Sequence, residues 1–440
     1  MWPYHPELLA RPVPRYTSYP TAAEFTQAVG GAELATALQG LAPHSAASLY
    51  VHIPFCKAIC CYCGCNTHRT NRPDRLDSYL EALDAELVWL AQRVGGTVSL
   101  DRIAFGGGSP NALDATRFVR LVDTILTSFA AGSPEISVEL DPRTLEAEWA
   151  ALLGKLGASR ASLGVQTLEP HVQAAIGRVQ PHALIKRAVR MLRENGIQSL
   201  NFDLMFGLPG QSDDDLARTI DAALALAPDR VALFGYAHVP QMIPRQRQID
   251  SAALPDTEAR FRQAANGHRR LLDAGMVQIG FDHFAQPGDP LAIAAAEGRL
   301  RRNFQGFTDD PAETLLGVGA TAISCLPQLV VQNEKNPGRY RMRTLAGEPA
   351  AALGVLRTDH DRECALVIED LLCCRTADLS GLPEDPLLEK RLAPFLQAGL
   401  CRLADDRLRI TPEGLPYSRA IASTFDRYRD GSSGAFSSAV

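Results

Sequence analysis

The sequence predicts an α/β fold in the form of a partial to complete barrel of parallel strands. From residue 46 to about residue 325, short apolar runs alternate with segments whose apolar residues recur at helical spacing. Strands that alternate with helices imply a parallel sheet, and six or seven such units are enough to curve into a barrel. A flat doubly wound sheet is the less favoured alternative. We expect an N-terminal arm (1–45), the barrel (46–325) and a smaller, mostly helical C-terminal domain (326–440).

The units can be placed on the chain one after another. The candidate strands are short apolar runs bounded by glycine, proline or polar residues. They are Ser48–Ile53, Arg102–Phe105, Ile136–Leu140, Ala161–Val165, Leu200–Met205, Val231–Phe234 and Met276–Phe281. Helical spacing is found around Leu76–Leu90 and over Asp114–Phe129, Thr144–Leu156, His182–Asn195, Asp213–Leu226 and Thr257–Ala274.

The two ends of the chain lack this alternation. Five prolines between Pro3 and Pro20 prevent a long helix, so the first 45 residues are expected to form an irregular arm. After about residue 326 the strand and helix signals no longer alternate. Residues 355–425 are predicted to be mostly helical, with a hairpin-like stretch around Leu403–Ile410.

Composition argues against several classes of function. The net charge is −6, from 44 basic and 50 acidic residues, so no basic surplus indicates a nucleic-acid-binding protein. No run of about 20 apolar residues marks a membrane span. The first residues lack the charged start and apolar core of a signal peptide. We therefore expect a soluble cytoplasmic protein.

Half of the ten cysteines lie between Cys56 and Cys65, directly after the first predicted strand. Such close cysteines cannot all pair with one another without severe strain. Cys56, Cys60 and Cys63 can ligate a [4Fe–4S] cluster and leave one iron open for S-adenosylmethionine (SAM). The alternative is a structural zinc site that adds Cys65 to the same three residues. Zinc sites usually pair two knuckles across a longer loop, so the spacing favours the cluster.

Polar or small residues follow five successive strands, at the end where parallel barrels place their chemistry. Gly106–Gly108 can bring a ligand close to the backbone, although the same glycines also suit a tight turn. Glu139 is a carboxylate within a buried strand and needs a partner. Gln166, Asp203 and His238 follow on the next three strands. Each alone can be structural, but together they indicate a site.

Several motifs extend this pattern over almost the whole chain. Tyr50–Cys56 (Tyr-Val-His-Ile-Pro-Phe-Cys) and the following cysteines are typical of radical SAM enzymes. More narrowly, the chain resembles the oxygen-independent coproporphyrinogen III oxidase family, and the arm motif Pro14–Ala22 separates that family from shorter relatives. The other matching segments are Cys63–Asn66, Gly207–Pro209, Tyr236–His238, Asp282–Ala285, Arg302–Gly306 and Ala322–Ser324.

The resemblance implies a reaction and its cofactors. The family converts the propionates of rings A and B of coproporphyrinogen III to vinyl groups, which gives protoporphyrinogen IX. A 5′-deoxyadenosyl radical takes a β-hydrogen, carbon dioxide leaves, and an acceptor removes the remaining electron. The implied cofactors are one [4Fe–4S] cluster and two SAM molecules. A low-potential donor such as flavodoxin or ferredoxin and a monomeric state are further implications.

The resemblance also assigns roles to residues at matching positions. The implied cluster ligands are Cys56, Cys60 and Cys63, whereas Cys65 is not a ligand in the family. Contacts to the SAM on the cluster fall on Tyr50, Gly106, Glu139 and Ile323. Residues around the two SAM molecules are Tyr62, Gly107, Gly108, Gln166, Arg178, Asp203, Ala237, Phe304 and Gln305.

Three departures from the family pattern keep alternatives open. Cys61 adds a fifth thiol, Ser109 stands where the family more often has threonine, and the C-terminal domain matches only weakly. The alternatives are a haem-handling radical SAM relative (a haem chaperone or a haem-degrading enzyme) and a zinc-stabilised barrel. Cys65 and the arm motif favour the oxidase. Because the substrate carries four propionates, we expect cationic residues in its pocket, with Arg15, Arg299, Arg301 and Arg302 as candidates.

Overall fold

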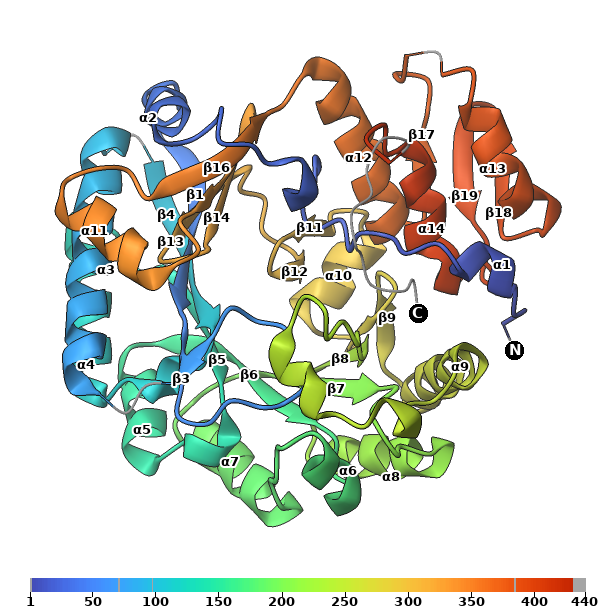
Figure 1. Cartoon of the computed structure of the whole chain (residues 1–440), viewed down its shortest axis with the longest axis horizontal. Coiled ribbons are helices and arrows are strands. Elements are labelled where there is room, and N and C mark those ends of the chain that lie inside the picture. Colours follow the sequence, from blue (N-terminus) through green and yellow to red (C-terminus); the bar gives the residue numbers. More distant parts are fainter. Residues whose placement is uncertain (1, 70–71, 97, 384, 430–440) are drawn as a thin grey trace.

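The computed structural model describes residues 2–69, 72–96, 98–383 and 385–429, and its centre is a large curved sheet (Figure 1). The sheet has 12 strands in the order β16-β15-β14-β13-β1-β4-β5-β6-β7-β8-β10-β9. Neighbours from β13 to β8 pair in parallel. These parallel strands are β1 (Ser45–Ile53), β4 (Val98–Gly107), β5 (Glu135–Leu140), β6 (Ala158–Gln166), β7 (Ser199–Phe206), β8 (Arg230–Gly235) and β13 (Thr314–Val318). Because the order begins at β16 and ends at β9, the barrel is open, which confirms the predicted partial barrel.

Helices follow the parallel strands and form the outer layer of the barrel (Figure 1). They match the predicted segments closely. Several begin at a side-chain cap, as where Ser212 and Asp215 form a capping box. Their bounds are α3 (Pro73–Val94), α4 (Ala115–Ser128), α5 (Ala147–Lys155), α7 (His182–Glu194), α8 (Asp213–Leu224) and α9 (Thr257–Asp273).

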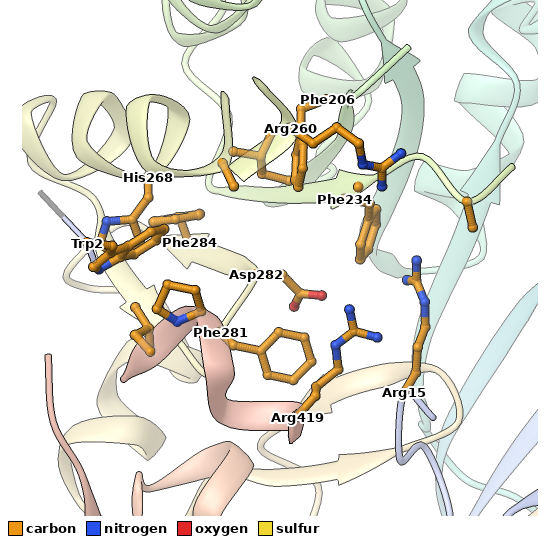
Figure 2. Close-up of a pocket in the computed structure, with 16 residues that line it drawn as sticks. Trp2, Arg15, Phe206, Phe234, Arg260, His268, Phe281, Asp282, Phe284 and Arg419 are labelled. Atoms are coloured by element: carbon orange, nitrogen blue, oxygen red, sulfur yellow. The ribbon is translucent and has the colours of Figure 1, made fainter. Parts of the chain in front are cut away.

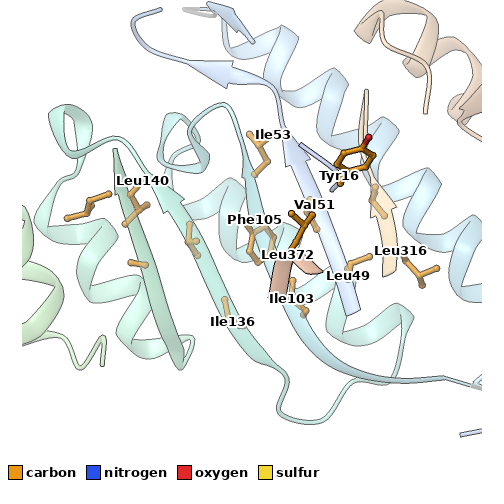
Figure 3. Packing of buried hydrophobic residues seen from close by; sticks show 14 of the residues in the cluster. Tyr16, Leu49, Val51, Ile53, Ile103, Phe105, Ile136, Leu140, Leu316 and Leu372 are labelled. Atoms are coloured by element: carbon orange, nitrogen blue, oxygen red, sulfur yellow. The ribbon is translucent and has the colours of Figure 1, made fainter. Parts of the chain in front are cut away.

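Alternation along each strand separates the core from the interior of the barrel. In β1, Leu49, Val51 and Ile53 are at most 1% exposed and pack in the main core with Phe105 of β4 (Figure 3). Side chains of neighbouring residues in a strand point to opposite faces. The intervening Tyr50 and its counterparts on the next strands therefore face the barrel interior.

Two parts of the sheet differ from the expectation. The seventh predicted strand is not a parallel unit, because β9 (Val277–Ile279) pairs antiparallel with β10 (His283–Ala285), which pairs antiparallel with β8. At the other edge the sheet continues beyond residue 326 through an antiparallel ribbon. That ribbon consists of β14 (Ile323–Leu326), β15 (Leu329–Asn333) and β16 (Ala351–Leu356).

The C-terminal part combines helices with a small sheet. It contains α12 (Asp359–Cys373), α13 (Leu388–Gln397) and α14 (Ser418–Ala422). The predicted hairpin is formed by β18 (Cys401–Ala404) and β19 (Arg407–Ile410), and β17 (Thr376–Asp378) joins it as a third strand. Residues 430–440 of the predicted domain lie outside the described residues, and the domain limits themselves stay a prediction.

The N-terminal arm is irregular, as its prolines predict, and runs beside the C-terminal part (Figure 1). Its helices are short: α1 (Pro6–Leu9) and α2 (Gly31–Gln39). The Tyr16 hydroxyl donates to Oδ2 of Asp426 at 2.9 Å, and the Tyr417 hydroxyl donates to the Pro3 carbonyl at 2.8 Å. These hydrogen bonds tie the two chain ends together. Within the described residues, no helix has the length and apolar character needed to span a membrane.

Candidate active site

The cysteine loop follows β1 and lines a cavity at the carboxyl end of the parallel strands. Cys56, Cys60, Cys63 and Cys65 all face this cavity, which has a volume of about 880 Å³. All four side chains are free thiols. The loop leaves the sheet after Pro54, where β2 (Phe55–Cys56) pairs with β3 (His68–Arg69). The three predicted ligands are therefore brought together on one side of one cavity.

Cys61, the additional thiol, packs elsewhere. Its backbone N–H donates to the Ile176 carbonyl at 3.1 Å, and its Sγ lies 3.5 Å from Oε1 of Gln248. Gly177, with a φ of +64°, allows this packing, since a Cβ atom there would stand 2.9 Å from Cys61 Sγ. Cys61 belongs to a small apolar cluster and does not line the cavity of the other four thiols.

Two guanidinium groups contact the sulfur of Cys60. Nη1 of Arg178 lies 3.3 Å from Cys60 Sγ and Nη2 of Arg143 lies 3.4 Å from it. Both arginines also bind the Asp141 carboxylate, at 3.3 and 2.6 Å. Burial opposes ionisation of Asp141, but the two arginines lower its pKa below the usual range. Two positive charges therefore stand beside one of the predicted cluster ligands.

Gly106–Gly108, at the end of β4, are required for three different close approaches. A Cβ atom on the first glycine would lie 2.6 Å from the Glu139 carboxylate. The second has a φ of +100°, and a Cβ there would lie 2.2 Å from the His52 ring. A Cβ on the third would lie 2.5 Å from the Phe55 carbonyl oxygen. The glycines thus pack the cysteine loop, β1 and β5 against one another.

Two carboxylates face the cavity from β5 and β7. Glu139 accepts a hydrogen bond from the Gly107 N–H at 3.1 Å. Asp203 accepts from Ser162 Oγ at 3.0 Å and from Asn201 Nδ2 at 2.8 Å. Burial within the barrel, followed by the charge of Asp203, raises the pKa of Glu139 to about 7. Burial also raises the pKa of Asp203. Such carboxylates are suited to ammonium or hydroxyl groups of a ligand.

The backbone is strained at Gln166, where β6 ends in the same cavity. This buried residue has a φ of +64°, a left-handed conformation that costs a non-glycine residue about 1 kcal/mol. The β6–β7 pairing shifts register between Gly164 and Gln166. Strain of this kind persists where the surrounding structure holds a side chain in a particular place.

Comparison with known proteins identifies the family. A model described as the Radical SAM superfamily matches residues 50–223, and one described as the HemN C-terminal domain matches residues 366–417. The chain is 42% identical over 427 residues to the oxygen-independent coproporphyrinogen III oxidase of Bradyrhizobium diazoefficiens, covering 95% of both proteins. It is 36% identical to the protein of the same name from Escherichia coli, covering 94% of this chain and 93% of the relative. The chain belongs to the oxygen-independent coproporphyrinogen III oxidase family.

A solved structure supports this membership of the oxidase family. Coproporphyrinogen III oxidase (HemN) from Escherichia coli, described as a radical SAM enzyme, matches with a TM-score of 0.90 at 34% identity. The match covers 97% of this chain and 99% of that chain. The protein is thus a radical SAM oxidoreductase, a class with a [4Fe–4S] cluster and SAM. Membership decides against the structural zinc alternative, and the free thiols beside two guanidinium groups fit the cluster.

Four further predicted residues of this oxidase-family chain lie in cavities next to the thiols. The Tyr50 hydroxyl is 3.2 Å from Nδ1 of His52, and its ring meets that of Phe304 edge-on at 4.7 Å. Ile323 lines the same cavity as these two aromatic residues. Gln305 lines another cavity of about 1350 Å³, which shares Glu139 and Asp203 with the thiol cavity.

Tyr62 and Ala237 are joined by a residue that the sequence did not single out. Nε2 of Gln246 donates to the Tyr62 carbonyl at 2.9 Å and to the Ala237 carbonyl at 3.0 Å. Gln246 is 1% exposed, so this link between the cysteine loop and the segment after β8 is internal. No sequence signal distinguishes this glutamine from its neighbours.

Sequence reasoning also missed residues that contact the predicted ones. Arg143 contacts Cys60, and its place directly after Asp141-Pro142 at the end of β5 is a signal that could have found it. Ser162 lies on the interior face of β6, four residues before Gln166, and alternation alone could have indicated it. Phe234 of β8 lines both the thiol cavity and the neighbouring one.

The four arginines expected to bind substrate do not all lie at one site. Arg299 is exposed and pairs with Glu297, two residues away, so it is an ordinary surface residue. Arg301 pairs with Glu369 at 3.0 Å. Arg302 and Arg15 do meet, because Nη2 of Arg302 donates to the Arg15 carbonyl at 3.2 Å.

Proposed function

We propose that this chain oxidatively decarboxylates two propionate side chains of coproporphyrinogen III to vinyl groups, without oxygen, and yields protoporphyrinogen IX. The observation that carries the proposal is the whole-length match to enzymes of that name, from the arm to the C-terminal part. The division into arm (1–45), barrel (46–325) and C-terminal domain (326–440) belongs to this proposal. The main sheet continues through β16, so its edge strands β15 and β16 fall on the C-terminal side of the proposed boundary.

Cys56, Cys60 and Cys63 would hold the [4Fe–4S] cluster. Cys65 lines the same cavity, and its hydrogen bond with Cys63 lowers the pKa of Cys63 to about 6. When bound, the cluster and SAM would supply the radical chemistry that takes a hydrogen atom from the propionate β-carbon, and the substrate would then lose carbon dioxide and one electron. The electron passes to an external acceptor, so the vinyl product has a closed shell.

The chain's own residues would bind and orient SAM. Glu139 and Asp203 offer acceptors for its ammonium and hydroxyl groups, and Gly107 and Gly108 line the same cavity. Arg178, held by Asp141 and the Gly164 carbonyl, has its guanidinium group fixed beside the thiols.

Two SAM molecules would share the interior. Tyr50, Gly106 and Ile323 are proposed, with Glu139, for the molecule on the cluster. The two adjoining cavities, which share Glu139, Ser162, Asp203 and Phe234, support room for a second molecule. The residues proposed around the pair are Tyr62, Gly107, Gly108, Gln166, Arg178, Asp203, Ala237, Phe304 and Gln305. A cytoplasmic location, a monomeric state and a flavodoxin or ferredoxin donor complete the proposal.

An anaerobic assay of the reconstituted protein tests the reaction. SAM, a low-potential reductant and coproporphyrinogen III are supplied, and 5′-deoxyadenosine and porphyrin products are quantified together. We expect vinyl products that depend on the cluster. Cleavage of SAM without a vinyl product would contradict the proposed substrate and point to a haem-handling role.

A pair of serine variants tests the ligand assignment. Cys60→Ser is expected to lose the cluster's absorbance and all cleavage of SAM. Cys61→Ser is the matched control, since Cys61 is the next residue and its sulfur packs in the apolar cluster beside Gly177. We expect this control to retain iron and sulfide at the wild-type level, and loss of the cluster in Cys61→Ser would refute the assignment.

A further inference from the structure

Another cavity lies where the arm, the barrel and the C-terminal part meet (Figure 2). We call it the arginine chamber, and its lining includes Arg15, Arg260, Arg419, Asp282, Phe234 and Phe281. These residues come from the arm, α9, α14, β8 and the turn between β9 and β10. The chamber therefore exists only when all three parts of the chain are assembled.

The arginine chamber carries an excess of positive charge. Arg15, Arg260 and Arg419 point their guanidinium groups toward the space beside Phe234 (Figure 2). Asp282 is the one carboxylate among the described residues that line it. Three guanidinium groups against one carboxylate leave a net charge of +2, since burial lowers the pKa of the lining residue His268 and keeps it neutral. Buried charge of one sign is costly unless an opposite charge accompanies it.

The arginines act on one another through this enclosed space. Burial, followed by the charge of Arg15, lowers the pKa of Arg419 to about 9. Burial likewise lowers the pKa of Arg260. Asp282, whose Oδ1 lies 2.6 Å from Nδ1 of His283, offers a single negative charge to the three arginines. A bound anion would relieve the repulsion among the arginines.

Aromatic rings form the walls between these charges. The guanidinium carbon of Arg15 lies 5.6 Å from the centre of the Phe234 ring, and that of Arg419 lies 5.8 Å from the centre of Phe281. Arg302 stands behind the wall, 5.0 Å from the same Phe281 ring, and fixes the Arg15 backbone. Apolar walls with several guanidinium groups suit a ligand that combines an apolar ring system with carboxylate arms.

The arginine chamber also adjoins the candidate active site. Phe234 lines the chamber, the thiol cavity and the cavity that holds Gln305. His283 packs edge-on against this ring at 5.4 Å between centres and lines the Gln305 cavity. A ligand anchored in the chamber would therefore reach the interior of the barrel past a single aromatic side chain.

We propose that the arginine chamber binds the carboxylate arms of the tetrapyrrole substrate that do not react. Arg15, Arg260 and Arg419 are then the residues that select a tetrapyrrole with several free carboxylates over one whose carboxylates are masked. The identity of this ligand rests on the proposed function, whereas the cation excess and the aromatic walls are features of the chain itself.

A change in the ligand tests the proposal without altering the protein. Anaerobic holoenzyme is titrated with coproporphyrin III, a fluorescent tetracarboxylate, and with its neutral tetra-amide. We expect the tetra-amide to bind at least about tenfold more weakly, because each charge-assisted contact is replaced by a neutral one. Equal dissociation constants for the two ligands would overturn the proposal.

Variants assign the effect to the arginine chamber. Arg15→Gln and Arg419→Gln are expected to raise the dissociation constant of coproporphyrin III roughly 10- to 100-fold and to leave that of the tetra-amide unchanged. Arg299→Gln, at an exposed arginine paired with Glu297, is the matched control. A parallel loss for the acid and the amide would show a structural role and overturn the assignment, as would no loss in either variant.

Turnover separates this inference from the proposed function. In the Arg15→Gln enzyme we expect the KM for coproporphyrinogen III to rise while cleavage of SAM without substrate stays at the wild-type rate. Vinyl product formed with an unchanged KM would refute the chamber and leave the proposed function standing. Arginine-dependent binding of coproporphyrin III without any vinyl product would support the arginine chamber and contradict the proposed function.

Discussion

Substitution of Glu139 by glutamine tests whether this carboxylate binds SAM as an anion. The side chain faces the cavity from β5, and its hydrogen bond from the Gly107 N–H, 3.1 Å long, fixes it beside the glycine turn. A hydrogen bond from a charged group contributes about 1.5–3 kcal/mol. The Glu139→Gln enzyme should therefore bind SAM about 10- to 150-fold more weakly.

The pH dependence of SAM binding gives a second, independent measure. Burial raises the pKa of Glu139 to about 7 in the ligand-free protein. The ionised form binds an ammonium group, so affinity is present above pH 7 and falls about tenfold per pH unit below it. The Glu139→Gln enzyme lacks this titration, and its affinity should be independent of pH through this range.

Calorimetric titration of the anaerobic holoenzyme with SAM from pH 5.5 to 8.5 measures both effects. Glu148→Gln, at an exposed position of α5 on the outer layer, controls for a general effect of losing one negative charge. If Glu139→Gln binds SAM as tightly as the wild type, or keeps the same loss of affinity below pH 7, the carboxylate is not the group that binds it.

Two stability predictions concern the frame around the site. Gly107→Ala should lower the free energy of unfolding, measured in urea, by about 2–5 kcal/mol, because its Cβ would stand 2.2 Å from the His52 ring at a φ of +100°. The control Gly132→Ala, with open space around it, should change this free energy by no more than about 0.5 kcal/mol. Burial raises the pKa of Glu86 to about 7 despite its hydrogen bond from Tyr340, so ionisation of this carboxyl destabilises the folded protein. The Glu86 carboxyl alone should then lower the free energy of unfolding by about 3 kcal/mol as the pH rises from 4.5 to 7. Glu86→Gln should remove this contribution and leave a shallower slope; an unchanged slope would contradict this.

Local pattern was enough to predict the strands and the side chains they present inward. In β5 the alternation of Ile136, Val138 and Leu140 with Ser137 and Glu139 separates the core from the interior, because a strand repeats every two residues. The cysteine spacing likewise placed the thiols on a loop after β1, where the structure has them. Both signals depend on neighbours in sequence, which is why they could be read without coordinates.

The local sequence carries no such signal for the direction of a strand or for its pairing with a distant strand. The apolar run Met276–Phe281 looks like any short strand, and nothing local states that β9 pairs antiparallel with β10. The pairing of β15 with β16 was missed for the same reason, since it joins residues 18 to 27 apart. Cys61 could not be separated from its four neighbours, because its packing depends on a left-handed turn at Gly177, more than 100 residues away.

The arginine chamber shows why the substrate is the part of the function that sequence leaves open. Arg15 follows two prolines in an arm, Arg260 lies in the first turn of an amphipathic helix, and Arg419 lies near the end of the chain, so each alone resembles a solvated cation. The arm's hydrogen bonds to the C-terminal part, together with the bond from Arg302 to the Arg15 carbonyl, bring the first and the last to one cavity wall. Chemistry at the cysteine loop is encoded within ten residues, whereas recognition of carboxylate arms is distributed over the whole fold. Losing the arm's contacts should therefore impair substrate binding before it impairs the cluster.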